Sequence, residues 1–224
     1  LGLSTGISRS GIVTPGIVTD SLVMKHMYPA GAVQPLSDGA AYFNESADDY
    51  ISVSNHADFQ LGATGDLSVT AWIFTGDNTD QGIIGKYGDA DNRWYFRLDN
   101  EGQIQFYSKS DSSGAARTGW NGGGSGSAEV LATNTWYHVA LSGDRSDTST
   151  GLKFYVNGVF DEEVSNGNET DNLDNDGAFL IGARTTTDTF GDGYLCNVGV
   201  WSRPLTQAEI KSIMWKQYAD LSTA

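Results

Sequence analysis

The sequence contains little cysteine, little positive charge and no long apolar run. It has one cysteine, and 13 lysine and arginine residues against 28 aspartate and glutamate residues, for a formal net charge of −15. A single cysteine excludes an internal disulfide framework, and Cys196 stands in an apolar alternation typical of a small buried side chain. Because phosphate binding needs a basic face, the acidic charge disfavours a nucleic-acid partner. No stretch approaches the roughly 18 apolar residues of a membrane span.

Motifs of hydrolytic enzymes are also missing. Most glycoside hydrolases need two carboxylates aimed at one cleft. The run Asp161-Glu162-Glu163 follows the Asn157-Gly158 turn, which is typical of a solvated hairpin rather than of such a pair. No G-x-S-x-G, phosphate-loop or H-E-x-x-H motif occurs. We expect a protein that is not an enzyme, in which residues 161–163 solvate a hairpin and His138 is a hydrogen-bonded sheet residue rather than a base.

Glycine and aromatic residues are abundant instead, with 28 glycines, 10 tyrosines, 9 phenylalanines and 6 tryptophans among 224 residues. Apolar residues alternate with period two in many short segments, which is typical of half-buried strands. Asn157-Gly158 is a strong signal for a two-residue hairpin turn. The segments are 41–43, 50–53, 67–73, 83–84, 94–98, 104–107, 153–156, 159–160, 178–181 and a last strand ending at Trp201. They predict an all-β, two-sheet antiparallel sandwich over residues 40–203.

One short helix is expected near the C-terminus. Thr206 and Glu209 form a capping-box pattern, and Leu205 with Ile210 can form the accompanying hydrophobic staple. Apolar residues at 210, 213, 214 and 215 supply one face. We predict a helix at about 206–218 that packs on the sandwich. The five tryptophans other than Trp120 lie in or beside strands or in this helix, and we expect them in the core.

Residues 1–39 differ from the rest and are predicted to form an extended N-terminal arm, with a single sandwich domain at 40–224. Three of the four prolines lie here, and the motif GIVT occurs twice. The segment is too apolar for a free linker, because its Ile, Val, Leu and Met side chains would be left in water. The arm therefore either packs on its own sandwich or docks on a partner.

Six short motifs, in order, resemble the laminin-G-like and pentraxin-like jelly rolls of the concanavalin A-like lectin/glucanase superfamily. They are DYISV at 49–53, LSVTAWI at 67–73, WYHVA at 136–140, FYVNG at 154–158, LIG at 180–182 and the closing pattern from Trp201 to Glu209. Cys196-Asn197 replaces the usual Asp-Glu of laminin-G-like domains and is similar to the pentraxin closing strand. The resemblance covers about residues 40–221. It implies a jelly roll with a C-terminal helix, and a function in binding rather than catalysis.

The resemblance to pentraxins also implies a calcium site. Hard cations need several oxygens that converge from loops. Asp91 and Asn92 stand where pentraxins carry an Asp-Asn calcium pair, and Asp188 opens a segment similar to the D-S-F that closes the pentraxin calcium loop. Thr186 and Thr187 replace the usual Glu-Gln. We therefore expect at most one weakly held Ca²⁺, with Asp91, Asn92 and Asp188 as ligands.

Two further loops contain residues of the kinds that bind metal ions or sugars. Residues 172–177 imitate the start of an EF-hand loop, but Ala183 stands where the twelfth-position Glu belongs, so we interpret them as a solvated acidic turn. Trp120 lies in a glycine-rich loop without strand alternation. It is the candidate ligand-binding residue, because sugar faces stack on exposed aromatic rings. The alternative is that Trp120 covers the edge of the sandwich.

Two classes of function follow. The first is a non-catalytic structural or decoration protein on a virion (capsid) surface, held to other virion proteins or to copies of itself through residues 1–39. No signal-peptide pattern is visible, and residues 16–31, GIVTDSLVMKHMYPAG, are similar to leaders that precede such domains in marine phage structural proteins. The alternative is a secreted, extracellular adhesion module that binds a cell-surface glycan with the help of calcium.

Overall fold

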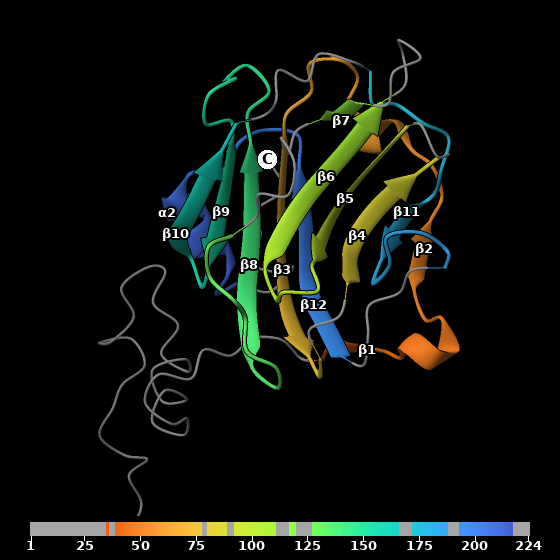
Figure 1. Ribbon diagram of the computed structural model, residues 1–224, viewed down its shortest axis with the longest axis vertical. Helices are drawn as coiled ribbons and strands as arrows, with labels where there is room; N and C mark the ends of the chain where they lie inside the picture. Colours follow the sequence, from red (N-terminus) through yellow and green to blue (C-terminus); the bar gives the residue numbers. More distant parts are fainter. Residues whose placement is uncertain are drawn as a thin grey trace, which may run out of the picture. The chain divides into compact units, whose positions relative to one another are not determined.

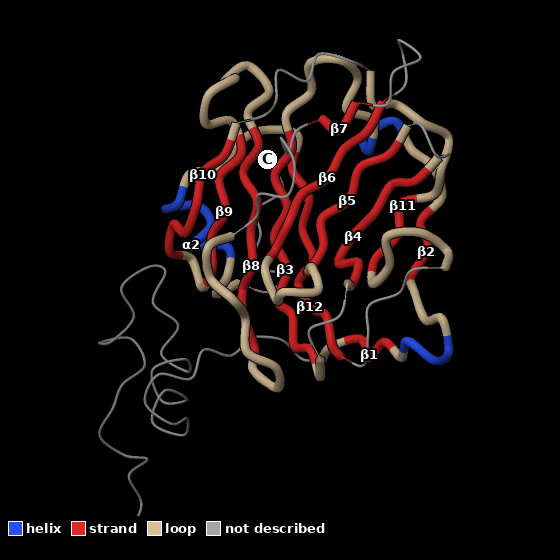
Figure 2. The backbone as a smooth tube through the Cα atoms, in the orientation of Figure 1, coloured by secondary structure: helices blue, strands red, loops and turns tan. Residues whose placement is uncertain are grey.

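A computed structural model describes residues 35, 39–77, 80–88, 92–110, 117–119, 127–165, 172–187 and 193–216. The predicted arm, apart from residues 35 and 39, lies outside the described residues. Strands dominate (Figure 2), as the alternation predicted. They are β1 (Ala41–Phe43), β2 (Ile51–Val53), β3 (Leu67–Thr75), β4 (Gln81–Tyr87), β5 (Arg93–Leu98), β6 (Ile104–Ser110), β7 (Arg117–Gly119), β8 (Trp136–Gly143), β9 (Leu152–Val156), β10 (Val159–Val164), β11 (Phe179–Ile181) and β12 (Gly193–Trp201). Two 3-10 turns, η3 (Glu45–Ala47) and η4 (Ala57–Phe59), and the helix α2 (Gln207–Ile213) complete the described elements.

The strands form two six-stranded antiparallel sheets that pack face to face. The order is β1-β12-β3-β8-β9-β10 in the first, here called sheet A, and β2-β11-β4-β5-β6-β7 in the second, sheet B. Figure 1 shows β4, β5 and β6 of sheet B in front of β3 and β12 of sheet A. This is the two-sheet jelly-roll sandwich that the sequence predicted.

The period-two pattern explains the core. In β3, Leu67, Val69, Ala71 and Ile73 point between the sheets, where they meet buried residues of sheet B such as Phe96. Each fully buried side chain of this size contributes about 1.5–3 kcal/mol to the free energy of unfolding. The residues of β3 between them face the other way, onto the outer surface of sheet A.

Strand β4 is longer than the sequence predicted, because its two glycines weakened the apolar pattern. A Cβ atom at Gly82 would lie 2.1 Å from the backbone nitrogen of Arg184, and one at Gly85 would lie 2.5 Å from the Arg184 carbonyl oxygen. The chain after β11 therefore crosses directly over β4, on the outer face of sheet B. Only glycine permits so close an approach of two backbones.

The hairpin and helix signals are confirmed. Asn157 and Gly158 have φ angles of 52° and 72°, as a two-residue turn of this kind requires. The Thr206 hydroxyl accepts a hydrogen bond from the Glu209 amide, and the Glu209 carboxylate accepts one from the Thr206 amide, at 3.3 and 2.8 Å. Arg203 also binds this carboxylate, and together these contacts lower the Glu209 pKa to about 2.

Helix α2 is shorter than the predicted range of about 206–218, since the last described helical residue is Ile213. It packs on the outer face of sheet A, where Leu205 and Ile210 are buried against Tyr155. The Trp72 indole donates a hydrogen bond to the Met214 carbonyl at 3.0 Å. Within the described part of the chain, no helix is long and apolar enough to cross a membrane.

Cys196 is buried, as expected, but the expectation that five tryptophans belong to the core is only partly correct. Trp72 and Trp94 are fully buried, whereas Trp215 is 45% exposed. Trp215 follows the last turn of α2, and its ring packs against that of Trp72 with the ring centres 6.1 Å apart. The apolar face of α2 therefore ends at Met214, which is buried.

Candidate functional site

A groove lies on the outer face of sheet B, where the chain after β11 crosses β4. Its volume is about 420 Å³. The lining residues are Tyr87, Gly88, Ala178, Leu180, Thr185, Thr186 and Thr187. The hydroxyl oxygens of Thr185 and Thr187 lie 2.9 Å apart and share a hydrogen bond. The groove thus combines one aromatic ring, one aliphatic side chain and a run of hydroxyl groups.

The loops that carry the predicted calcium ligands start at this groove. Gly88 precedes residues 89–91, and Thr187 precedes residues 188–192. Asp91 and Asp188 themselves lie outside the described residues, so their convergence stays a prediction. Asn92 is half-buried, and its carbonyl oxygen accepts a hydrogen bond from the Gly88 amide at 3.3 Å.

The described part of the groove provides hydroxyl and carbonyl oxygens but no carboxylate. Across the described ranges, no group of three or more His, Cys, Asp and Glu residues could hold a metal ion. A calcium ion at this place would therefore depend on Asp91 and Asp188. Trp120, the other predicted site residue, also lies outside the described residues and directly follows β7, which ends at Gly119.

Beside the groove, the outer face of sheet B carries tyrosines and arginines in register. Arg93 on β5 lies opposite Tyr87 on β4 and Lys109 on β6. In the next row, Tyr95 lies opposite Tyr107, and their rings stack with centres 4.7 Å apart. The period-two alternation brings these side chains to one face, but only the pairing of β4, β5 and β6 makes them neighbours.

Guanidinium groups cover the tyrosine rings. Arg93 lies 4.9 Å from the centre of the Tyr87 ring, and Arg184 lies 5.3 Å from that of Tyr95. Arg97 also stacks on Tyr95, at 5.8 Å. Burial raises the pKa of Tyr95, although both arginines act in the opposite direction. Stacking of a guanidinium on an aromatic face is favourable by about 0.5–1 kcal/mol at exposed sites.

The EF-hand-like segment at residues 172–177 is a solvated acidic turn, as interpreted, because Asn172, Asp174 and Asp176 are exposed. Its backbone also has a structural role. Lys86 is buried, and its ammonium donates hydrogen bonds to the Asn175 and Gly177 carbonyl oxygens at 2.8 and 2.9 Å. Asp174 accepts a hydrogen bond from the Gly62 amide at 2.6 Å. Backbone carbonyl oxygens of this loop, rather than its acidic side chains, thus bind an internal ammonium. Sequence reasoning missed Lys86 because nothing local in β4 marks it as the partner of this loop.

His138 is buried, but the expectation that it is hydrogen-bonded through its side chain is wrong for Nδ1. This atom has no hydrogen-bond partner among the described residues. Burial lowers the His138 pKa to about 3, and the ring packs edge-on against Trp72 with centres 5.4 Å apart. His138 is therefore a neutral packing residue of sheet A.

The acidic run at 161–163 lies in β10, which pairs with β9. Asp161 does more than solvate a hairpin, because its carboxylate accepts hydrogen bonds from the amides of Ala128 and Glu129, at 2.6 and 3.2 Å. This contact joins the edge of sheet A to the segment before β8. It is a structural contact rather than half of a catalytic pair.

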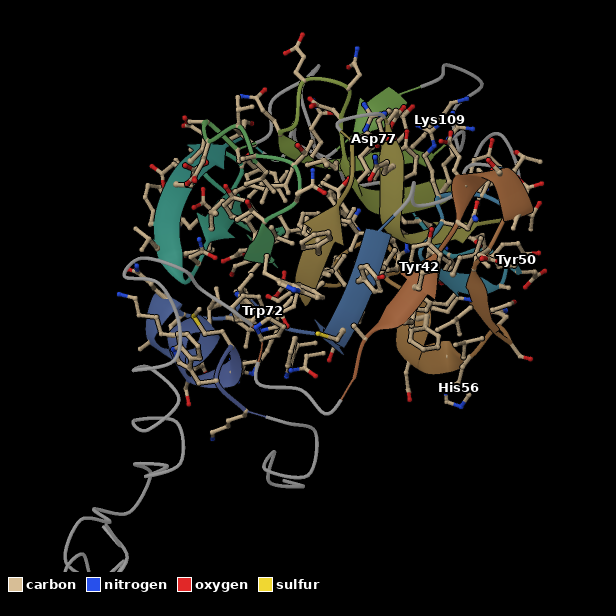
Figure 3. All side chains as sticks on the ribbon, turned by 90° about the horizontal axis from the view of Figure 1, so that it is seen from below. Tyr42, Tyr50, His56, Trp72, Asp77 and Lys109 are labelled. Carbon is tan, nitrogen blue, oxygen red and sulfur yellow. The ribbon has the colours of Figure 1, made fainter. Side chains whose placement is uncertain are left out.

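A second exposed aromatic surface lies on the opposite side of the sandwich. Tyr42, Tyr194, Phe74 and Trp136 stand in direct register across β1, β12, β3 and β8. Tyr42 is 50% exposed. Figure 3 shows Tyr42 and Trp72 on one side of the sandwich and Lys109 on the other. This row is called the sheet A aromatic row.

The fold places the chain among the two-sheet jelly-roll sandwiches. The sequence matches the Laminin_G_3 family, described as the concanavalin A-like lectin/glucanases superfamily, over residues 45–211. The chain belongs to this family, as its motifs suggested. No curated protein sequence matches the chain.

Solved structures share the fold at low sequence identity. The binding domain of Paraclostridial Mosquitocidal Protein 1 is 17% identical, with a TM-score of 0.58 over 82% of this chain and 45% of that one. Domain 4 of AbnA, a GH43 extracellular arabinanase from Geobacillus stearothermophilus in complex with arabinotriose, is 18% identical, with a TM-score of 0.54 over 80% of this chain and 79% of that one.

A putative carbohydrate binding protein from Bacteroides ovatus is 23% identical, with a TM-score of 0.53 over 78% of this chain and 46% of that one. The chain thus spans less than half the length of this protein and of the mosquitocidal binding domain. At such identities these likenesses show a common fold.

Proposed function

We propose that this chain is a non-catalytic carbohydrate-binding module that holds a glycan in the groove on the outer face of sheet B. The observation that carries the proposal is the composition of the groove, which places Tyr87 and Leu180 next to the hydroxyls of Thr185, Thr186 and Thr187. Sugar rings present apolar C–H faces and polar hydroxyl edges. A small set of apolar side chains with convergent hydroxyls suits both.

The family and its structural relatives support this reading. The chain belongs to a lectin/glucanase superfamily, and the AbnA domain of similar fold was solved with an arabinotriose. The groove residues that the structure describes carry hydroxyl and backbone groups and no carboxylate pair. Such groups bind and orient a sugar, whereas glycoside hydrolysis commonly uses two carboxyl groups. We therefore propose binding without hydrolysis.

The comparisons favour this glycan-binding reading over a virion-surface role. We propose an extracellular location together with it. The virion reading depends on residues 1–39, which lie almost entirely outside the described residues. The two readings are compatible, because an arm that anchors the domain leaves the outer face of sheet B available. We separately propose that residues 1–39 anchor the sandwich domain to a partner.

The experiment is a glycan-array screen of the full chain, followed by calorimetric titration of the best oligosaccharide. Tyr87→Ala should weaken binding at least tenfold, an effect of about 1.4 kcal/mol, because it removes the ring that lines the groove. Tyr42→Ala is the matched control, since Tyr42 is an exposed tyrosine of the sheet A aromatic row. Failure of every glycan to bind, or equal losses in both variants, would contradict the proposal.

A further inference from the structure

Positive charge gathers on the outer face of sheet B, although the formal net charge of the chain is −15. Arg97 and Arg184 both bind the same carboxylate, with their Nη1 atoms 2.6 and 2.8 Å from Oδ2 of Asp80. Two guanidinium groups therefore meet at the Asp80 carboxylate. Gln105 supplies a further acceptor to Arg97 at 2.7 Å.

Arg93 differs from these two arginines. Its guanidinium donates a hydrogen bond to the Tyr87 hydroxyl at 2.5 Å and lies over the Tyr87 and Tyr107 rings, 4.9 and 5.6 Å from their centres. Among the described residues it has no carboxylate partner, and its buried Nε atom has no hydrogen-bond acceptor. An arginine without a carboxylate partner in the described ranges thus lies against Tyr87, which lines the groove.

The geometry points to an acidic saccharide as the ligand of this groove, with a carboxylate or sulfate group bound by the Arg93 guanidinium. This inference rests on the proposed glycan-binding function and names the chemical class of the glycan. The planar guanidinium presents paired N–H donors that match the oxygens of either anionic group. A group that reaches Arg93 from the groove also supplies the counter-charge that the described residues do not.

The arginines on the outer face of sheet B, Arg93, Arg97 and Arg184, disfavour an uncharged ligand. A neutral sugar would stack on an open aromatic face, but Tyr95 is only 7% exposed beneath Arg97 and Arg184. The Arg93 guanidinium lies over the Tyr87 ring, 4.9 Å from its centre. An anion can bind this guanidinium directly, and hydrogen bonds between ionised partners are about twice as strong as neutral ones.

The overall charge makes this contact selective. A net charge of −15 disfavours the approach of long polyanions. An acidic group on an oligosaccharide meets positive charge where Arg93 and its neighbours lie. Recognition of a polyanion by charge alone is therefore disfavoured, and a specific contact at Arg93 is required.

The test uses the full chain and matched oligosaccharides: a neutral chain, the same chain carrying a uronic acid, and the same chain carrying a sulfate ester. Titration calorimetry should show tighter binding of at least one acidic form than of its neutral parent. Arg93→Gln should reduce the affinity for the acidic form about tenfold, or about 1.4 kcal/mol, and leave the affinity for the neutral form unchanged. Arg93→Lys should retain part of the preference for the acidic form over its neutral parent, because it keeps the charge and loses the planar donors.

Arg203→Gln is the control, since Arg203 lies on the other side of the sandwich, paired with Glu209 at 2.7 Å. Preference for the uronic acid or for the sulfate identifies which anion the groove takes. If neutral and acidic forms bind equally, or if Arg93→Gln weakens both alike, acid recognition is wrong while glycan binding stands. If no oligosaccharide of any kind binds, both proposals fail. Circular dichroism of each variant checks that the sandwich is intact.

Discussion

The ammonium nitrogen of Lys86 lies 2.8 Å from the backbone oxygen of Asn175, inside a loop whose sequence imitates a calcium-binding loop. The Asn55 side chain and the Gly177 carbonyl also accept hydrogen bonds from it, both at 2.9 Å, and the Asn175 side-chain oxygen accepts one at 3.3 Å. Burial lowers the Lys86 pKa, and the nearby Asp176 and Asp174 partly oppose this. An internal cation therefore holds residues 172–177 against the end of sheet B.

We predict that Lys86→Met destabilises the protein by about 2–4 kcal/mol. The substitution leaves buried carbonyl oxygens without a donor, and such unsatisfied groups are costly. Urea unfolding followed by fluorescence measures the loss. Lys211→Met, at an exposed position of α2, should change the stability by less than about 0.5 kcal/mol. Equal stability of the two variants would mean that the Lys86 contacts contribute little.

We predict that His138 makes the fold acid-sensitive. Its folded-state pKa is about 3, below the ordinary value of about 6.5, so the unfolded chain binds more protons between these values. Stability is therefore full above about pH 6.5 and falls as the pH drops towards 3, by about 3 kcal/mol between pH 7 and pH 4.

The corresponding variant is His138→Phe, which keeps an aromatic ring against Trp72 and cannot take up a proton. Urea titrations at pH 7 and pH 4 should show a smaller loss of stability for the variant than for the parent. Other carboxylates titrate in both proteins, so the difference between the two losses is the quantity to compare. Identical losses would show that His138 is protonated without cost in the folded state.

We predict that Asp91, Asn92 and Asp188 hold one weakly bound Ca²⁺ at the groove on sheet B. The loops that carry them start at Gly88 and Thr187, which both line this groove. Calorimetric titration of chelator-treated protein should reveal one site with a dissociation constant of about 10⁻⁴–10⁻³ M.

Asp188→Asn should abolish that heat, because it removes one of the two carboxylates available to the ion. Asp58→Asn is the control, since the Asp58 side chain is 83% exposed near η4. Absence of heat at millimolar Ca²⁺ in the parent protein would leave these loops without a metal.

We predict that residues 1–39 mediate assembly on a neighbouring copy or a larger scaffold such as a capsid. Ile12, Val13, Ile17 and Val18 are among several apolar side chains in this segment, and each would contribute about 1.5–3 kcal/mol if fully buried. Deletion of residues 1–20 should give a folded monomer that no longer assembles. Light scattering after size-exclusion chromatography measures this. A deletion variant that unfolds, or one that assembles like the parent, would show that the arm has another role.

The sequence by itself determined the sandwich, its hairpins and the start of α2. Alternation in β3 and the Asn157-Gly158 turn are local signals, because each depends on neighbours within a few residues. The capping box of Thr206 and Glu209 is local in the same sense, and all three features appear in the structure. The end of the helix was less certain, since no comparable stop signal follows Ile213.

Only the tertiary structure decided where the residues of the groove meet. Tyr87 and Arg93 lie on the consecutive strands β4 and β5, whereas Thr187 belongs to the chain after β11, far away in sequence, and lines the same groove as Tyr87. The pairing of Lys86 with residues 172–177 is likewise invisible locally. Strand order and register bring these groups together, and the backbone approach over Gly82 and Gly85 shapes the groove. Such non-local contacts follow from packing the whole sandwich, which no short segment of the chain encodes.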